Sequence, residues 1–318
     1  MPARRVLITG VANFWGTRLA LRLAAEPDVE KVVGVDTRRP SDEVREAIAF
    51  VEGDLRSPDL APVVRAAAPD TICHNDVQQF PEPGRSARLM HDMNVVGTLQ
   101  LLSACDGLST LRTIVVRGSA AIYGSEPAAP AFFTEDLARR YPLRTRFQRD
   151  IGELESLVDT FARRHPGVTC TMLRMQPVLG TTLDTPITRL FRLRVIPTVM
   201  GFDPRMQFLH EDDSVEAVLA AMRAPVHGAV NVAGPGTVSL ARVLRRLGRV
   251  SVPIPHPVFG RVAGALARAG GTEMTEDIER YLRYGRGVDI RRLVDEVGFR
   301  PAFSSEGTVQ AMAQAVAA

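Results

Sequence analysis

The sequence predicts an α/β protein, because short β-branched strands alternate with longer amphipathic helices through its first half. These strands are apolar on both faces, which is typical of a parallel sheet that helices cover on both sides. The expected strands are 6–8, 31–35, 49–51, 71–73, 113–116 and 168–173. Together these features predict a Rossmann-type doubly wound parallel sheet.

The expected helices lie between these strands, at about 17–25, 89–104 and 147–164. The first helix ends near Pro27 and the third ends before Pro166, because proline cannot continue a helix. After Gly180 the sequence becomes richer in proline and less periodic. This change predicts a smaller C-terminal lobe, which would hold the substrate.

The predicted division is therefore a dinucleotide-binding domain over 1–178 and a substrate-binding lobe over 179–318. Two short apolar stretches, 208–210 and 229–232, look like strands that rejoin the main sheet. We therefore expect about 206–234 to return to the first domain. The last residues, 311–318, are expected to form a helical tail.

The composition fits a globular protein, with 45% apolar and 24% charged residues in 318. No apolar run approaches the roughly 18 residues of a membrane span, and the N-terminus lacks a signal-peptide core. We therefore expect a cytoplasmic protein without membrane contact. The formal charge of +3 comes from scattered arginines rather than a basic stripe, which argues against nucleic acid. The cysteines, which lack metal-site spacing and are expected to be buried thiols, are Cys73, Cys105 and Cys170.

The strongest local motif is the glycine turn between the first strand and the first helix. Backbone N–H groups and the helix dipole favour a phosphate at such a turn, here at Phe14 and Trp15. Gly10 makes the turn and Gly16 allows close packing of helix on strand. Asn13 replaces the middle glycine; asparagine tolerates left-handed geometry, but its side chain would crowd the phosphate.

Asp36, at the end of the second strand, predicts the choice of dinucleotide. A carboxylate there hydrogen-bonds the adenosine ribose hydroxyls and repels a 2′-phosphate, which favours NAD over NADP. Arg38 and Arg39 follow and would instead attract that phosphate, so NADP stays open as the alternative.

Several further segments resemble the extended short-chain dehydrogenase/reductase family, in its NAD-dependent epimerase/dehydratase branch, which includes UDP-glucose 4-epimerases. The resemblance runs nearly end to end and follows the family's order. It implies that Asp54, Leu55, His74 and Asn94 contact the cofactor, and that helices 89–104 and 147–164 form a homodimer. The matching segments are 53–55, 94–98, 119–124, 208–213, 231–234 and 298–301.

The resemblance also implies where the chemistry belongs. In the family, a serine orients the substrate while a tyrosine, four residues before a lysine on one helix, transfers the proton. Ser119 occupies the serine position, but Phe147 and Ile151 stand where tyrosine and lysine belong. Neither side chain exchanges a proton, and Lys31 is the only lysine in the chain. The usual dyad is therefore absent.

The family's small residues after the fourth strand are replaced here by polar and charged ones, including Asp76, whose charge would repel a pyrophosphate. An alternative acid–base set around the nicotinamide pocket would comprise His74, Asp76, Arg149 and Asp150. A solvated helix face explains the last two residues equally well.

The substrate is predicted only by association. The family's arginine before its Phe-x-His segment aligns with Met206, and the candidates for contact with a nucleotide sugar are Arg205, Arg283 and Arg286. Two hypotheses follow. The protein binds NAD and acts on a nucleotide sugar or other alcohol by rearranged chemistry, or it is a catalytically inactive dinucleotide-binding sensor or structural subunit.

Overall fold

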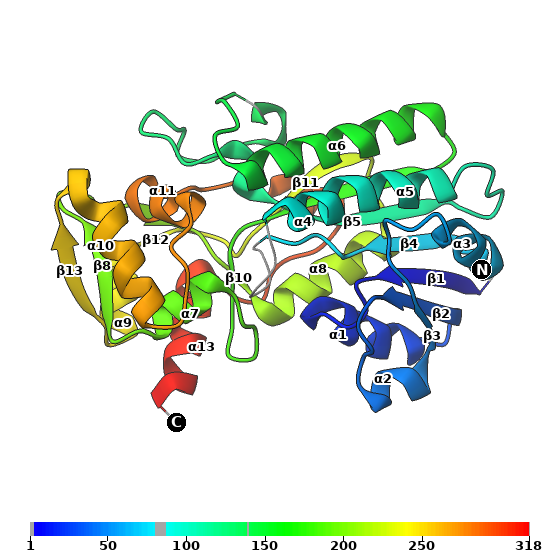
Figure 1. The fold of residues 1–318 in the computed structure, drawn as a ribbon, viewed down its shortest axis with the longest axis horizontal. Helices are drawn as coiled ribbons and strands as arrows, with labels where there is room; N and C mark the ends of the chain where they lie inside the picture. The colour runs from blue at the N-terminus through cyan, green and yellow to red at the C-terminus, as the bar shows by residue number, and fades with distance from the viewer. Residues whose placement is uncertain (1–2, 80–86, 139, 318) are drawn as a thin grey trace.

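The computed structural model describes residues 3–79, 87–138 and 140–317. Its centre is a seven-stranded parallel sheet in the order β11-β6-β5-β4-β1-β2-β3 (Figure 1). Successive strands are added toward one edge of the sheet as far as β3 and toward the other edge from β4 onward, so the strand order switches between β1 and β4. Doubly wound α/β proteins bind ligands at such a switch point. The strands are β1 Arg4–Thr9, β2 Val29–Asp36, β3 Ala49–Glu52, β4 Thr71–His74, β5 Thr113–Ser119, β6 Thr169–Met175 and β11 Gly228–Val232.

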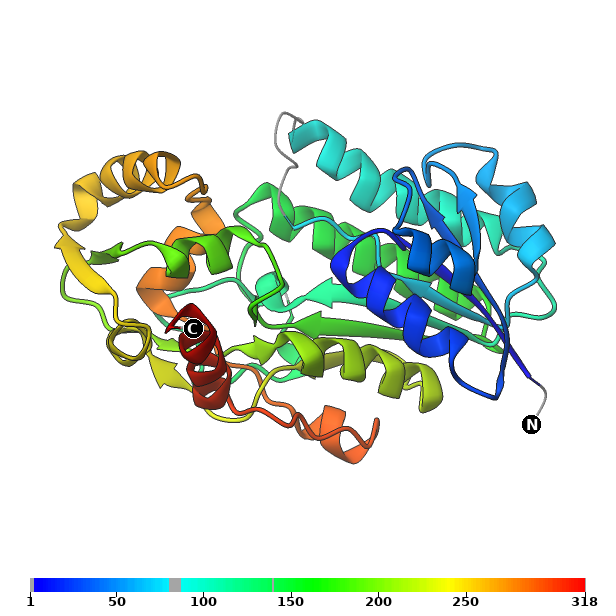
Figure 2. The same cartoon turned by 90° about the horizontal axis from the view of Figure 1, so that it is seen from below.

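Helices cover both faces of this sheet (Figure 2). One apolar core joins the sheet to α3, α5 and α6, and another joins it to α1, α2 and α8. Both faces are buried, which explains why the strands are apolar throughout. The bounds are α1 Phe14–Ala24, α2 Asp42–Ala47, α3 Leu60–Ala67, α5 Gly97–Ala104, α6 Arg146–Arg164 and α8 Glu211–Arg223.

The helix predicted over 89–104 consists of three stretches rather than one. It begins as α4, Ala87–His91, widens into a π-helix over Asp92–Val96 and continues as α5. The amide N–H of Gly97 reaches back to the carbonyl of Asp92, five residues earlier. Such wide turns are frequent at functional sites, and this one contains Asn94.

The second lobe is built from short strands around its own core. The prediction that 208–210 rejoins the main sheet is wrong, because β10 pairs with β7 instead. Only β11 returns from this part of the chain to pair with β6. The remaining strands are β7 Val178–Leu179, β8 Val195–Val199, β9 Arg205–Met206, β10 Leu209–His210, β12 Val238–Ser239 and β13 Val250–Ile254.

Most helices of the lobe pack around these strands, whereas α12 packs against β11 of the main sheet. Helix α13 ends the described chain. Among the residues that the structure describes, no helix has both the length and the apolar character needed to cross a bilayer. All three cysteines are buried and free. The helices are α7 Pro186–Arg192, α9 Leu240–Arg246, α10 His256–Ala269, α11 Glu276–Tyr284, α12 Arg291–Asp295 and α13 Ser305–Ala317.

Candidate functional site

The turn between β1 and α1 requires glycine at two positions. Gly10 has φ +67°, and a Cβ there would stand 2.7 Å from the Asn13 amide nitrogen. A Cβ on Gly16 would stand 2.1 Å from the carbonyl oxygen of Gly10. The helix therefore starts in direct contact with the turn, as close approach to a phosphate demands.

Asn13 differs from the sequence-based expectation. Its φ is −84°, so it is extended rather than left-handed, and it caps α1 by accepting a hydrogen bond from the Gly16 N–H at 2.9 Å. The same oxygen accepts a 2.7 Å bond from the Asn75 amide. The side chain is thus tied to protein partners, and the N–H groups of Phe14 and Trp15, in the first turn of α1, lack acceptors within the helix.

Asp36 ends β2 beside this turn and is buried. Its carboxylate accepts hydrogen bonds from the backbone N–H groups of Ala12 and Arg38, both at 2.9 Å. The Arg38 guanidinium lies 3.7 Å from the same carboxylate. A fixed anion therefore stands at the C-terminal edge of the sheet, with a cation beside it.

The other predicted cofactor residues support the site from around it. Asp54 pairs with Arg56, and Leu55 is buried against α5. The Asn94 amide makes two hydrogen bonds to the backbone of Gln78, at 2.8 and 2.9 Å. Asn94 therefore fixes the chain segment that follows β4.

His74 lies inside the fold rather than at its surface. Its ring nitrogens bond to the hydroxyls of Thr9, at 2.8 Å, and Thr98, at 2.9 Å. Burial, with the nearby charge of Arg117, lowers the pKa of His74 to about 3. The imidazole is therefore neutral and joins β1 and β4 to α5.

The alternative acid–base set is not assembled in the structure. Asp150 bonds to His91 at 2.7 Å, which links α6 to α4. Arg149 is exposed and donates to the carbonyls of Leu143 and Arg144. Neither residue lines the cavities described below, so this correction leaves only Asp76 of the set at the site.

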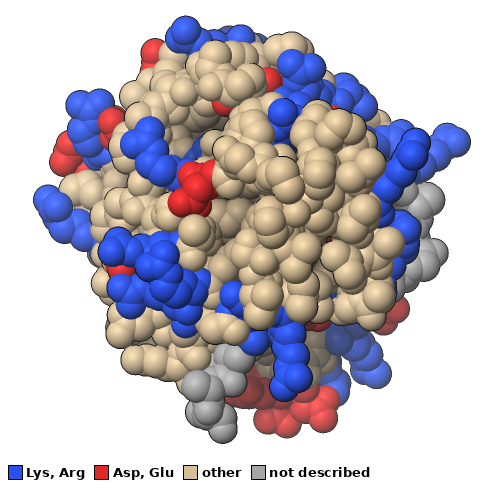
Figure 3. Space-filling model, turned by 90° about the vertical axis from the view of Figure 1, so that its left-hand side faces the viewer, with Lys and Arg blue, Asp and Glu red and all other residues tan. Residues whose placement is uncertain are grey.

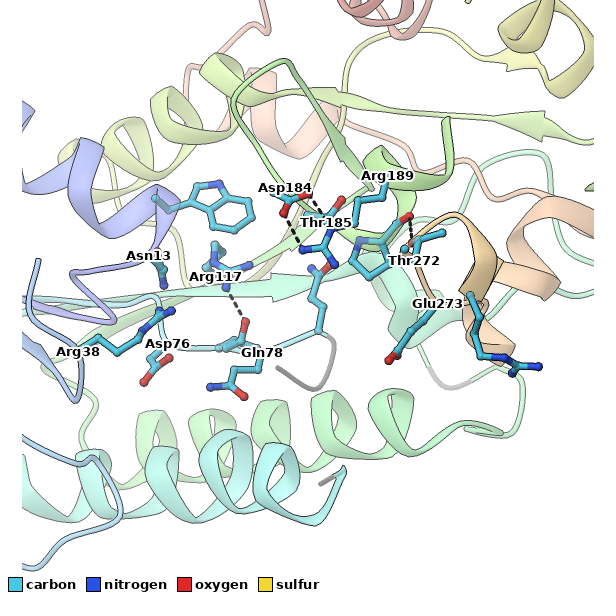
Figure 4. A pocket seen from close by; sticks show the side chains of 16 residues that line it. Asn13, Arg38, Asp76, Gln78, Arg117, Asp184, Thr185, Arg189, Thr272 and Glu273 are labelled. Atoms are coloured by element: carbon cyan, nitrogen blue, oxygen red, sulfur yellow. Dashed lines mark hydrogen bonds and ion pairs between the residues drawn. The ribbon is translucent and has the colours of Figure 1, made fainter. Parts of the chain in front are cut away.

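A larger cavity of about 570 Å³ opens between the turn at α1 and the second lobe (Figure 4). Asn13 and Arg38 lie at one end of it, while Arg189 and Glu273 lie at the other. Its wall also holds Asp76, which stands against Gly10, and two glutamines. The lining residues are Asn13, Trp15, Arg38, Asp76, Val77, Gln78, Gln79, Arg117, Asp184, Thr185, Pro186, Arg189, Arg268, Gly271, Thr272 and Glu273.

Arg117 is a functional candidate that the sequence reasoning missed. It projects from β5 on the same face as Ser119 and is almost completely buried. Its guanidinium donates to the side chain of Asn75 at 2.8 Å and to the carbonyl of Val77 at 2.5 Å. Burial lowers its pKa to about 10, against the opposing pull of the Asp76 charge, so it stays cationic at neutral pH.

Ser119 lines a smaller cavity of about 60 Å³. Phe147 forms part of its wall, while Ile151, one helical turn further along α6, is fully buried in the core. The two cavities adjoin, because Trp15, Gln79 and Thr185 line both. The remaining lining residues are Ala121, Pro177, Val178, Ile187, Asp277, Ile278, Tyr281 and Arg286.

None of the four tyrosines offers a free hydroxyl in the Ser119 cavity: two have hydroxyls bound to other groups, and the other two line neither cavity. Tyr123 bonds to Asn231 and accepts from Arg174, and burial raises its pKa to about 12. Tyr281 lines the smaller cavity, but its hydroxyl exchanges hydrogen bonds with the backbone of Gln207, and burial raises its pKa. The remaining two, Tyr141 and Tyr284, line neither cavity.

Of the three predicted substrate arginines, Arg286 lines the smaller cavity. Its guanidinium lies 5.2 Å from the ring of Tyr281. Arg205 is exposed on β9, and Arg283 stacks against Phe202 at 4.8 Å. The last two positions line neither cavity.

Comparison with known proteins decides the family. Residues 6–233 match the NAD dependent epimerase/dehydratase family. The chain belongs to this family. An uncharacterized protein of Mycobacterium tuberculosis is 35% identical over 306 residues, which cover 94% of this chain and 81% of the relative. A UDP-glucose 4-epimerase of Mycolicibacterium smegmatis is 30% identical over 145 residues, 42% of this chain and 44% of that protein.

Solved structures show that this epimerase/dehydratase family member shares the fold of UDP-glucose 4-epimerases. The enzyme of Thermotoga maritima, solved with UDP-glucose, superposes with a TM-score of 0.74 at 17% identity, covering 98% of this chain and 97% of that one. MoeE5 in complex with UDP-glucuronic acid and NAD gives a TM-score of 0.74 at 22% identity, covering 98% of both chains.

One more residue of this family member was missed: Asp277, which lines the smaller cavity together with Ser119. Gln148, in the first turn of α6, donates to it at 2.9 Å. Burial raises the pKa of Asp277, although hydrogen bonds and the charge of Arg286 oppose the rise. The acidic start of α11 was visible in the sequence, but nothing there placed it in the same cavity as Ser119. Within the described ranges, no group of three or more side chains suited to a metal ion occurs.

Proposed function

We propose that this family member binds NAD at the C-terminal edge of its main sheet and does not catalyse the family's tyrosine–lysine chemistry. Gly10 and Gly16 form a cradle that a Cβ would fill, and α1 presents its N-terminus there. Asp36 would bind the adenosine ribose. These residues fit the adenosine and pyrophosphate half of a dinucleotide.

The residues that would surround the nicotinamide of the bound dinucleotide support a binding role rather than catalysis. A bound nicotinamide supplies a hydride acceptor or donor, but the protein must still move a proton. Phe147 and Ile151 contribute only hydrocarbon, and the tyrosine in the smaller cavity has its hydroxyl bound to backbone. This apolar replacement on α6 is the observation that carries the proposal of a dinucleotide sensor or regulatory subunit.

Asp76 lines the larger cavity next to the glycine turn, where its negative charge would oppose a pyrophosphate. The charge of Asp76 interacts electrostatically with Arg117 and Arg56, and Arg117 lines the same cavity. These cations offset the carboxylate, so we expect binding to be weakened rather than abolished.

Calorimetric titration of the purified protein with NAD, NADH and NADP tests the proposal. We expect saturable binding of NAD and weaker binding of NADP. The NAD-loaded protein is then mixed with UDP-glucose, UDP-glucuronic acid and simple alcohols while absorbance reports NADH. No reduction is expected, and stoichiometric NADH formation would contradict the proposal. Absence of binding to any dinucleotide would exclude the sensor role.

Asp277 favours a second candidate function, in which an alcohol is oxidised by rearranged chemistry. Its raised pKa and its place in the wall of the Ser119 cavity suit a group that accepts a proton from a substrate hydroxyl. This candidate predicts NADH formation that Asp277→Asn abolishes while NAD affinity stays unchanged. The binding role predicts no NADH in either protein.

We also propose a cytoplasmic homodimer formed through α5 and α6. Leu99 on α5 is 46% exposed, and Val96 just before α5 is 36% exposed. Such exposed apolar side chains are expected where a second subunit covers the helix. Sedimentation velocity tests this assembly: a dimer that Leu99→Asp dissociates supports it, and a wild-type monomer excludes it.

A further inference from the structure

An apolar surface lies on the second lobe, far from the turn at α1. Of eleven strongly exposed large apolar side chains in the described part of the chain, eight belong to this lobe. Val250 is the most open of them, at 60%. We call these eight the lobe patch: Val195, Met200, Phe202, Val250, Val252, Val258, Val262 and Leu266.

The lobe patch follows from the way α10 packs. Phe259, Ala263 and Ala267 bury one face of α10, where Phe259 and Ala263 meet the end of the β8–β13 sheet. Val258, Val262 and Leu266 follow at four-residue spacing, so they form a second apolar stripe along the helix that stays exposed. The opposite end of the same sheet also stays uncovered, at the register pair Val195 and Val250.

The segments that carry the lobe patch contribute cations only, although Glu279 of α11 lies close to Gly260 of α10. Segments 185–202 and 217–272, which hold β8, α9, β13 and α10, contain ten arginines and no aspartate or glutamate. Arg194, Arg245 and Arg261 are exposed, and none of them pairs with an acidic side chain in the described ranges. Figure 3 shows this end of the molecule, where a broad uncharged surface is bordered by many blue side chains and by a few red ones.

We propose that the lobe patch docks on an anionic lipid membrane surface. Exposed aliphatic side chains on a helix enter the boundary between headgroups and acyl chains, while arginines beside them attract anionic lipids. Exposed aliphatic side chains next to arginines favour a lipid surface over nucleic acid. A nucleic acid presents its charged phosphate backbone to the arginines but no apolar layer into which the aliphatic side chains could insert. The proposal concerns a surface helix, so it departs from the expectation of no membrane contact, which rested on the absence of a spanning segment. It does not depend on NAD binding.

The test is flotation of the full-length protein with vesicles of phosphatidylcholine alone or with 30 mol% phosphatidylglycerol, as probes. We expect binding to the anionic vesicles only, weakened by salt. Val258→Asp with Val262→Asp should abolish it. Arg194→Gln, Arg245→Gln and Arg261→Gln should each weaken it about fivefold, the change that corresponds to about 1 kcal/mol per cation near the surface.

Matched controls are Phe132→Asp, an equally exposed apolar site, and Arg65→Gln, an exposed arginine on α3. Neither should change flotation, and circular dichroism checks that every variant is folded. Failure of the wild type to float with anionic vesicles would overturn the proposal. So would flotation that the aspartate pair leaves unchanged, or a self-association in sedimentation that the pair abolishes without any vesicle binding.

Discussion

The guanidinium of Arg117 lies over the indole ring of Trp15, with 4.1 Å between its Cζ and the ring centroid. The indole N–H donates in turn to Ser214 on α8, at 2.8 Å. Both side chains line the larger cavity, and Trp15 also lines the smaller one. A stacked cation thus stands where the proposed dinucleotide passes from its pyrophosphate to its nicotinamide end.

Replacing Arg117 with methionine tests whether this cation supports NAD binding. The variant keeps the volume over Trp15 but removes the donors to Asn75 and Val77 and leaves the Asp76 charge less compensated. We expect NAD affinity to fall about tenfold, or about 1.4 kcal/mol. Unfolding in urea should show a loss of about 1–3 kcal/mol from the unpaired carbonyls. Unchanged affinity by calorimetry would remove Arg117 from the binding site.

Gly16→Ala tests the contact between helix and turn. The added Cβ would stand 2.1 Å from the Gly10 carbonyl oxygen, and backbone cannot rotate away. We expect a loss of at least about 3 kcal/mol in the free energy of unfolding, together with loss of NAD binding. Gly167→Ala is the matched control, because nothing lies within 4 Å of its Cβ. A stable, NAD-binding Gly16→Ala variant would contradict the geometry of the turn.

Asp36→Ala tests the preference for NAD. Removing the carboxylate deletes the acceptor for the ribose hydroxyls and the anion that opposes a 2′-phosphate, while Arg38 remains beside it. NAD affinity should fall about tenfold and NADP affinity should rise, so that the ratio of the two dissociation constants narrows or inverts. Arg38→Gln should weaken only NADP. If the ratio is the same in Asp36→Ala as in the wild type, the carboxylate does not select the dinucleotide.

The main sheet was predictable from the sequence. Its strands are buried on both faces, so they appear as short, continuous apolar runs rich in β-branched residues between the helices. The glycine turn and Asp36 were predictable for a similar reason, since their roles depend on backbone geometry and on neighbours close in sequence. The family assignment rested on the same motifs and is confirmed.

Contacts between distant segments were not predictable. Arg117 looked like one more residue of an apolar strand, and only the fold shows that its partners come from the segment after β4. Asp277 meets Gln148 across 129 residues. The segment 208–210 has a strand-like composition, but composition does not reveal that its partner is β7.

Phe147→Tyr and Ile151→Lys test whether restoring the dyad restores chemistry. Phe147 already lines the Ser119 cavity, so a hydroxyl there should be tolerated with a loss below about 1.5 kcal/mol. Ile151 is fully buried, so lysine should cost about 3–5 kcal/mol as an unpaired buried charge. We expect the single tyrosine variant to fold and stay inactive, and the pair to gain at most slow NADH formation. Ile151→Met controls for volume; wild-type turnover equal to that of the pair would show that the dyad is irrelevant.

His74 predicts how stability depends on pH. Its pKa is about 3 in the folded protein, lowered from 6.5, so below pH 6.5 the unfolded chain binds a proton that the native protein does not. Stability should therefore fall as the pH drops from 6.5 toward 3, by about 1.4 kcal/mol per unit for this one group. His74→Gln removes the titration, so the difference in unfolding free energy between wild type and variant should shrink steadily between pH 7 and pH 5. His227→Gln, at an exposed histidine, should leave the wild-type slope unchanged. A His74→Gln slope equal to that of the wild type would mean that folding does not lower the pKa of this imidazole, which would contradict a neutral ring held between Thr9 and Thr98.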